Sequence, residues 1–228
     1  MAKSTNDERS PFDLPPGDIL GRMIQLRDWH AAIAEVTSRL EAADTTERRG
    51  FYHLFLATLY KLVARSARRR EDEAMNSIYR DKAESAYEES LAQDPLNITA
   101  RLSCADFHLR HRKDAEKALP FLEPFGDSDV SKILSMTQQE HRRLAMRGAA
   151  FATLGDIEEA RAALEEAYGS SEFQKLLPYS YNTPFWTMMS NKVKLPASVL
   201  EPILEHLKQF ENHKPRNIEK FREKLTDR

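Results

Sequence analysis

Residues 144–167 read LAMRGAAFATLGDIEEARAALEEA and form the clearest internal pattern of the chain. Large residues at Leu144, Phe151 and Leu164 are spaced there by small ones at Gly148 and Ala160. Glycine is otherwise scarce, with 7 in 228 residues, while hydrophobic residues make up 41% and charged residues 31%. This composition suits amphipathic helices better than a glycine-punctuated β-barrel, so a helical fold is expected.

The stretch resembles the tetratricopeptide repeat (TPR), a helical pair of about 34 residues. In that family, small residues stand where the two helices approach closely, and large residues fill the gaps. The resemblance implies that Gly148 and Ala160 lie at the close approach, that Phe151 and Leu164 are the fillers, and that Gly155 makes the turn. Arg147 stands where the family usually has Leu, so its side chain must snorkel or find a partner.

A second copy of the pattern is split between residues 53–60 and residues 83–95. Its small residues, Ala57 and Ala83, are 26 positions apart, whereas Gly148 and Ala160 are 12 apart. The additional residues, around 68–77, are charged but contain neither Gly nor Pro. We therefore expect this charged insertion, near residues 65–78, to lengthen both helices and their connection.

Two weaker copies cover residues 19–36 and 104–122, the latter with a second helix shortened by Pro120 and Pro124. The resemblance thus spans residues 18–168 and implies an all-α, right-handed TPR-like solenoid of three to four helix pairs. Capping residues support the helix boundaries, with Asp18, Asp44 and Ser198 as expected N-caps.

The two ends of the chain differ from this pattern. Residues 1–17 are polar and rich in Pro, so we expect a disordered tail. Residues 169–228 carry two amphipathic helices, 198–210 and 215–225. We expect them to cap the last repeat within the same domain, and 198–210 to pack on the helix 160–167.

Charge and cysteine content limit the class of protein. The chain has 34 Lys and Arg residues against 36 Asp and Glu, so its net charge favours binding neither to nucleic acids nor to membranes. Cys104 is the single cysteine, which fits a reducing compartment. No apolar segment resembles a signal peptide or a membrane span. A cytoplasmic protein without membrane association is expected.

Catalytic signatures such as a phosphate-binding glycine loop or an H-E-x-x-H motif are absent from the sequence, so we predict a protein that is not an enzyme and uses no cofactor. The best metal candidate is the set Cys104, His108 and His111, which share a helical face at i, i+4 and i+7. The alternative is a buried thiol beside ordinary imidazoles, and this alternative is preferred, so no metal site is predicted.

A basic edge is predicted from residues at the C-terminal ends of first helices in the repeats: Arg65, Arg68, Arg69, Arg70, Arg110, Arg112 and Lys113. Such an edge could hold an acidic partner or a phosphate backbone. The alternative is that Arg65–Arg70 pair with Glu71, Asp72 and Glu73 at helical spacing and form a solvated face. The latter interpretation is preferred.

Aromatic and Met residues are dense between residues 176 and 196. Tyr179, Tyr181, Phe185, Trp186 and Met188 belong to this cluster. It is interpreted either as an interaction surface or, preferably, as a plug between the cap and the last repeat.

Members of the TPR family usually bind peptides in the concave groove formed by first helices. Some members bind acidic C-terminal tails with Lys and Asn there, but the matching positions here are Leu54, Thr58, Leu102, Asp106, Ala145 and Ala149. These suggest an apolar groove, filled by a protein partner or by the chain's own C-terminal region. We therefore predict a protein-interaction scaffold or adaptor, with a nucleic-acid-associated helical repeat as the alternative.

Overall fold

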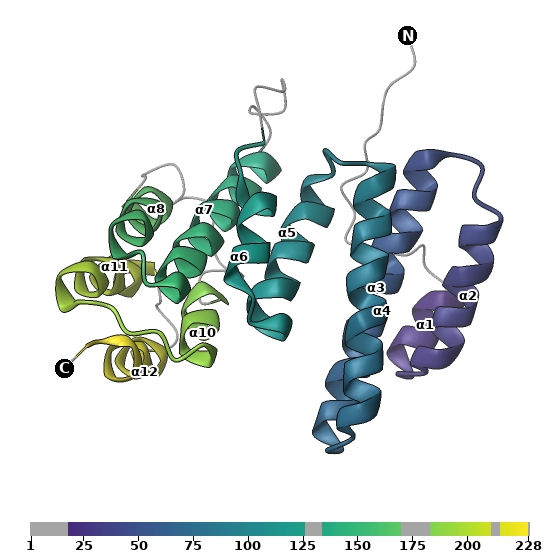
Figure 1. Ribbon diagram of the computed structural model, residues 1–228, viewed down its shortest axis with the longest axis horizontal. Coiled ribbons are helices and arrows are strands. Elements are labelled where there is room, and N and C mark those ends of the chain that lie inside the picture. The colour runs from purple at the N-terminus through teal and green to yellow at the C-terminus, as the bar shows by residue number, and fades with distance from the viewer. Residues whose placement is uncertain (1–17, 126–133, 170–182, 211–214, 228) are drawn as a thin grey trace, which may run out of the picture. The chain divides into compact units, whose positions relative to one another are not determined.

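The computed structural model describes residues 18–125, 134–169, 183–210 and 215–227 (Figure 1). Apart from connections and one isolated parallel bridge between Leu195 and Thr226, these residues are helical. The all-α prediction is therefore confirmed for the described part of the chain. The expected N-terminal tail, residues 1–17, lies outside it.

The chain divides into two compact units, Met1–Ala100 and Arg101–Arg228, which are described separately. None of the described helices combines the length and apolar character needed to cross a membrane. The first unit contains α1 (Ile19–Gln25), α2 (Trp29–Glu41), α3 (Thr46–Arg69) and α4 (Glu73–Gln93), and α5 (Ile98–Phe107) begins in it. The second contains a π-helix (His108–Arg112), α6 (Ala115–Ala118), a 3-10 turn (Leu119–Leu122), α7 (Leu134–Leu154), α8 (Ile157–Gly169), α10 (Thr183–Ser190), α11 (Ala197–Phe210) and α12 (Pro215–Leu225).

The N-terminal ends of the helices follow capping chemistry, with small differences from the expected positions. Asp18 caps α1, as expected, by accepting a hydrogen bond from the Leu20 amide at 2.8 Å. Thr45, rather than Asp44, caps α3, while Asp44 forms an ion pair with Arg48. The expected cap at Ser198 is also wrong, because α11 begins at Ala197, where the Pro196 carbonyl accepts from the Leu200 amide.

The long hairpin of α3 and α4 dominates the first unit. Ala57 and Ala83, the small residues of the split copy, are fully buried. At the open end, Ser90 Oγ donates to the Gly50 carbonyl at 2.8 Å, and a Cβ on Gly50 would lie 3.3 Å from Gln93 Cβ. The helices therefore pack with small residues at their interface.

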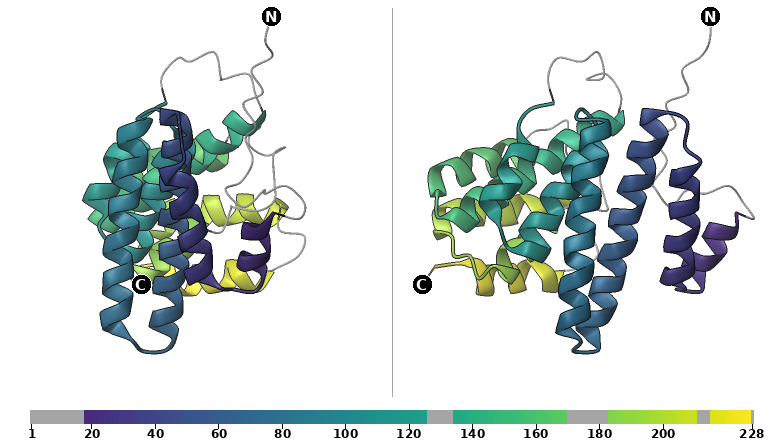
Figure 2. Two further views of the ribbon diagram at one scale, coloured as in Figure 1. Left: turned by 90° about the vertical axis from the view of Figure 1, so that its right-hand side faces the viewer. Right: turned by 45° about the vertical axis from the view of Figure 1, so that its right-hand side comes forward.

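The additional residues of the insertion lengthen both helices, as expected, but not their connection. Only three residues separate α3 from α4, and Glu71 turns the chain with a φ of 61°. As a result, the closed end of the hairpin extends past α1 and α2 in each view (Figures 1 and 2).

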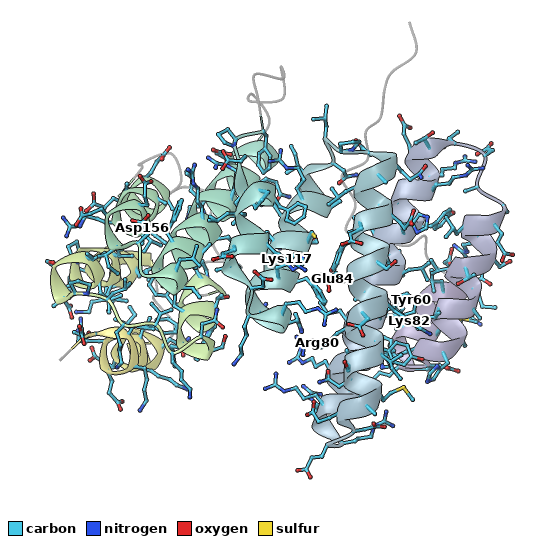
Figure 3. The ribbon with its side chains drawn as sticks, viewed as in Figure 1. Tyr60, Arg80, Lys82, Glu84, Lys117 and Asp156 are labelled. Atoms are coloured by element: carbon cyan, nitrogen blue, oxygen red, sulfur yellow. The ribbon has the colours of Figure 1, made fainter. Side chains whose placement is uncertain are left out.

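In the second unit, α7 and α8 form the pair predicted from residues 144–167. A Cβ on Gly148 would lie 2.5 Å from Leu164 Cγ and 3.3 Å from the Ala160 carbonyl oxygen, so the two helices approach closely there. Gly155 turns the chain with a φ of 85°, and Asp156, labelled in Figure 3, precedes α8 and accepts from the Glu159 amide.

The unusual Arg147 of this pair has found a partner on its own helix. Its guanidinium lies over the Phe151 ring, 5.3 Å from the ring centroid, and Phe151 packs against the core of the second unit. One turn of α-helix separates the two residues, so the cation–π contact is local.

The C-terminal helices complete the core of the second unit. Helix α11 packs on α8, and α10 packs on both α7 and α12. Their buried side chains form one cluster with Ala160, Leu164 and Ala167 of α8; α11 and α12 contribute Val199, Leu200, Ile203, Leu204, Leu207, Ile218, Phe221 and Leu225. The predicted packing of residues 198–210 on the helix 160–167 is thus confirmed.

The helix that follows α5 is short, as its prolines predict. Helix α6 has one turn and continues as the 3-10 turn that contains Pro120. Arg143 of α7 holds this segment, donating to the Leu122 carbonyl at 2.7 Å and lying over the Phe125 ring. Arg101 lies over the same ring, 5.0 Å from its centroid.

Candidate protein-interaction surface

The six predicted groove positions lie on the first helices of the pairs, but most of them are buried. Thr58 of α3 is half-buried and donates its hydroxyl to the Leu54 carbonyl. Buried side chains occupy the other five positions: Leu54, Leu102, Asp106, Ala145 and Ala149.

In the pair α7–α8, the chain itself fills the groove positions. Ala145 and Ala149 belong to the same buried cluster as Phe185 and Met188 of α10. Helix α10 lies against α7, so residues outside the repeat-like region cover this face of α7. This agrees with the alternative that the chain's own C-terminal region fills the groove. The helix that does so is α10, not α11.

The described part of the aromatic segment, residues 183–196, is largely core. Phe185 and Met188 are fully buried, whereas Trp186 is 37% exposed. The Lys220 ammonium lies over the Trp186 ring, 4.9 Å from the centroid. The interpretation of this segment as a plug is confirmed for α10, while Tyr179 and Tyr181 lie outside the described residues.

The π-helix begins within the set of candidate metal ligands, and its two histidines stack on different rings. Cys104 and His108 are buried, and the His108 ring stacks on Phe121, with centroids 5.8 Å apart. The His111 ring stacks instead on Phe107 at 5.5 Å. A π-helix shifts the register that an α-helix would keep between positions 104, 108 and 111. Among the residues that the structure describes, no group of three potential ligands has metal-binding geometry.

The predicted basic edge consists of two groups, one in each compact unit. Arg110 and Arg112 lie in the π-helix and Lys113 follows it. Arg110 pairs with Asp106 at 3.3 Å, and Arg112 lies over the Phe107 ring. Local contacts thus engage both arginines of this group.

The other group lies at the C-terminal end of α3, where all four arginines are exposed: Arg65, Arg68, Arg69 and Arg70. Over residues 18–125 and the other described ranges, no ion pair or side-chain hydrogen bond involves them. The expectation that they pair with Glu71, Asp72 and Glu73 is therefore wrong.

The failure of this expected pairing has a simple cause. Helical i, i+4 spacing brings side chains together only while the helix continues. Here α3 ends at Arg69, so the acidic residues fall in the turn and on α4. Asp72 caps α4 by accepting from the Met75 amide at 3.0 Å, and Glu73 accepts from the Asn76 side chain.

Apolar side chains are exposed next to this turn. Met75 is 37% exposed and Ile78 is 50% exposed. With Lys82 they occupy positions i, i+3 and i+7 of α4, and therefore share one face. The Lys82 ammonium lies 5.2 Å from the Tyr79 ring centroid and 5.9 Å from that of Tyr60 (Figure 3).

Tyr79 of α4 contacts residues of α2. The His30 ring meets Tyr79 edge-on, and Trp29 and Ile33 of α2 pack against the cluster of Val63, Ala64 and Tyr79. Met75 and Ile78 lie in the first two turns of α4, at the closed end of the hairpin that extends past α2 (Figures 1 and 2). Burial raises the pKa of the Tyr60 hydroxyl above its usual range, with Tyr79 as the smaller cause.

We refer to Arg65, Arg68, Arg69, Arg70, Met75 and Ile78 together as the hairpin end. The sequence analysis found its arginines but missed Met75 and Ile78. Their i, i+3 spacing within a charged insertion could have indicated an exposed apolar pair. Comparisons of the chain with protein-family models, with curated proteins and with solved structures found no match.

Proposed function

We propose that the protein is an interaction module made of TPR-like helical pairs, and that the hairpin end is the surface it offers to a protein partner. The observation that carries the proposal is the exposure of Met75 and Ile78 on a hairpin that extends past its neighbouring helices. Exposed apolar side chains beside cationic ones are typical of binding surfaces.

The repeat-like packing supports this proposal. Close contacts at Gly148 with Leu164, and fully buried alanines at positions 57 and 83, agree with the register of the TPR resemblance. Repeats of this kind present surfaces built on rigid helices, which suits partner binding.

The apolar groove is a weaker candidate for the binding surface. Phe185 and Met188 already lie with Ala145 and Ala149 in one core cluster. A partner segment could contact these positions only by displacing α10, with the loss of its buried apolar surface. The hairpin end needs no such rearrangement.

Affinity capture with a matched variant tests the proposed function. Purified protein and the Met75→Ser/Ile78→Ser double variant are each cross-linked in lysate of the source cells, and Leu154→Ser serves as control. Leu154 is 44% exposed and lies in the other unit. We expect at least one protein captured by the wild type and by Leu154→Ser to be lost with the double variant. Identical capture by all three proteins would refute the role of the hairpin end.

A second candidate function is association with nucleic acid. The specific observation in its favour is the group of exposed arginines on α3 that make no ion pair within the described residues. Three carboxylates at Glu71, Asp72 and Glu73 oppose it, because they would repel a phosphate backbone that approaches the same turn.

A further inference from the structure

We infer that the protein binds a second copy of itself, with the exposed face of α4 in one copy packed antiparallel on the same face of the other. Met75 and Ile78 of both copies lie at the centre of this contact, and Glu71 of one copy meets Lys82 of the other at each end. The inference rests on the proposed protein-binding function and names the partner of that site.

Met75, Ile78 and Lys82 form one exposed face of α4. They lie at i, i+3 and i+7, and all three side chains are exposed, with Ile78 at 50% and Met75 at 37%. The closed end of the hairpin, where Met75 and Ile78 lie, extends past α1 and α2 (Figures 1 and 2). A helix of another molecule can therefore approach the two apolar side chains without displacing α1 or α2.

The order of residues along this part of the chain is self-complementary. From the turn onward it is acidic, apolar, apolar and basic, at Glu71, Met75, Ile78 and Lys82. The successive spacings are 4, 3 and 4 residues, so the series is symmetric about the midpoint between Met75 and Ile78. In a symmetric dimer each pair of contacting residues occurs twice. A two-fold axis at this midpoint thus brings Met75 to Ile78 and Glu71 to Lys82 on both sides.

The carboxylate of Glu71 is available for such an ion pair. Asp72 caps α4 through the Met75 amide, and Glu73 accepts a hydrogen bond from the Asn76 side chain. Glu71 is exposed, and within the described ranges its side chain enters no ion pair. Of the three acidic residues at the turn, Glu71 is the one left to a cation of a partner.

The ammonium of Lys82 is held at the other end of the face. It lies 5.2 Å from the Tyr79 ring centroid and 5.9 Å from that of Tyr60 (Figure 3). These contacts restrict the side chain, so less conformational entropy is lost when a carboxylate binds to it. Asp81 does not compete on this face, because one residue along a helix turns the side chain by about 100°.

The arginines of α3 take no part in this contact. Helical spacing directs Arg65 and Arg69 to the side of α3 opposite Tyr60, whereas Lys82 lies over the Tyr60 ring. The contact is therefore small, with two apolar side chains and two ion-pairing groups from each copy. We expect a weak dimer with a dissociation constant between about 1 µM and 1 mM.

Sedimentation velocity of the full chain at increasing concentration, up to about 1 mM, tests the inference. We expect the average mass to rise from that of a monomer toward that of a dimer. Glu71→Lys and Lys82→Glu should each raise the dissociation constant at least about tenfold, because each places like charges at both ends of the contact. Met75→Ser/Ile78→Ser should do the same by removing its apolar centre.

Glu88→Lys is the matched control. Glu88 is an exposed acidic residue of the same helix, and helical spacing places it on a different side of α4 from Lys82. This charge reversal should leave the dissociation constant unchanged. Circular dichroism and urea midpoints establish that each variant is folded.

A mixture of the two charge variants distinguishes this dimer from other forms of self-association. Glu71→Lys has lysine at both positions, and Lys82→Glu has glutamate at both. A dimer of one variant with the other therefore has opposite charges at both ends. We expect this mixed dimer, and the double exchange Glu71→Lys/Lys82→Glu, to associate about as tightly as the wild type. Recovery in the mixture would also show that neither variant is misfolded.

Three outcomes would overturn the inference: a monomer at every concentration, a dimer that these variants do not weaken, or two charge variants that fail to associate when mixed. Capture from lysate separates this failure from that of the proposed function. A different protein that is lost with Met75→Ser/Ile78→Ser, while the wild type stays monomeric, would leave the interaction module in place and exclude the second copy.

Discussion

Gly148 and Leu164 approach so closely that any side chain on Gly148 would overlap the Leu164 isobutyl group. An added Cβ would lie 2.5 Å from Leu164 Cγ and 2.8 Å from Leu164 Cδ2. Both residues are buried, and Leu164 belongs to the core cluster that joins α7 and α8 to the C-terminal helices. This contact determines the separation of α7 and α8.

Gly148→Ala should destabilise the protein even though Ala is the better helix former. Overlap with Leu164 costs about 1–3 kcal/mol, and the gain in helix propensity, about 1 kcal/mol, offsets part of it. Gly148→Leu should be worse still, because its bulk also reaches the Ala160 backbone. Urea midpoints of the variants measure the differences in the free energy of unfolding.

A double-mutant cycle isolates the contact. With Leu164→Ala as background, Gly148→Ala no longer overlaps a side chain and should become neutral or stabilising by up to about 1 kcal/mol. An equal cost of Gly148→Ala in both backgrounds would show that the Ala160 backbone, not Leu164, limits the approach.

Burial of His141 should make stability fall in mild acid. Burial lowers the pKa of this imidazole from 6.5 to about 4, and its ring meets Tyr168 edge-on. The unfolded chain therefore binds a proton below pH 6.5 that the folded protein does not bind until about pH 4. The contribution of neutral His141 to the free energy of unfolding is therefore complete above pH 6.5, the pKa in the unfolded chain. It is lost as the pH falls, by about 2 kcal/mol between pH 7 and pH 5.

His141→Gln should remove this part of the pH dependence, measured as urea midpoints at pH 7, 6 and 5. Burial also lowers the pKa of the half-exposed His53, so a smaller dependence of the same sign remains. If the urea midpoints of His141→Gln fell with pH as steeply as those of the wild type, another group would account for the pH dependence of stability.

The C-terminal helices should be essential to the fold of the second unit. Leu204 of α11 is fully buried in the cluster with Ala160 and Leu164. Leu204→Ala should cost about 2–5 kcal/mol, whereas the exposed Lys208→Ala should change stability by less than about 0.5 kcal/mol. Truncation after Gly169 removes α10 to α12 and should abolish cooperative unfolding. A soluble truncated chain that unfolds cooperatively would mean that these helices are a detachable, regulatory element.

Lys192→Gly should stabilise the protein. Lys192 lies in the turn after α10 with a φ of 57°, a left-handed conformation that costs a residue with a Cβ more than it costs glycine. The expected gain is about 0.5–1 kcal/mol in thermal or urea unfolding. Lys194→Gly is the control, because Lys194 has no positive φ; this change removes chain stiffness and the exposed hydrogen bond that Lys194 Nζ donates to the Thr226 carbonyl at 3.4 Å. Equal effects at the two positions would exclude relief of backbone strain.

The sequence by itself determined which segments are helical and where small residues separate them. Gly148, Ala160, Ala57 and Ala83 could be identified because close helix contact excludes large side chains, a constraint visible in spacing alone. The absence of Gly and Pro from residues 65–78 likewise predicted longer helices. These are local properties, since they depend on conformational preference and on residue size.

Only the tertiary structure decided which charges meet and which surfaces are filled. Arg65–Arg70 and Glu71–Glu73 look complementary in sequence, but α3 ends at Arg69 and the turn separates them. Ala145 and Ala149 look like an open groove until α10, some 40 residues further along the chain, covers them. The sequence did not decide the exposure of Met75 and Ile78 either, because apolar residues at i and i+3 fit a buried helix face as well as an exposed one. The covering of α7 by α10 joins residues distant in sequence, so local patterns carry no information about it, and the end of α3 decides between helical neighbours that the charge pattern alone would pair.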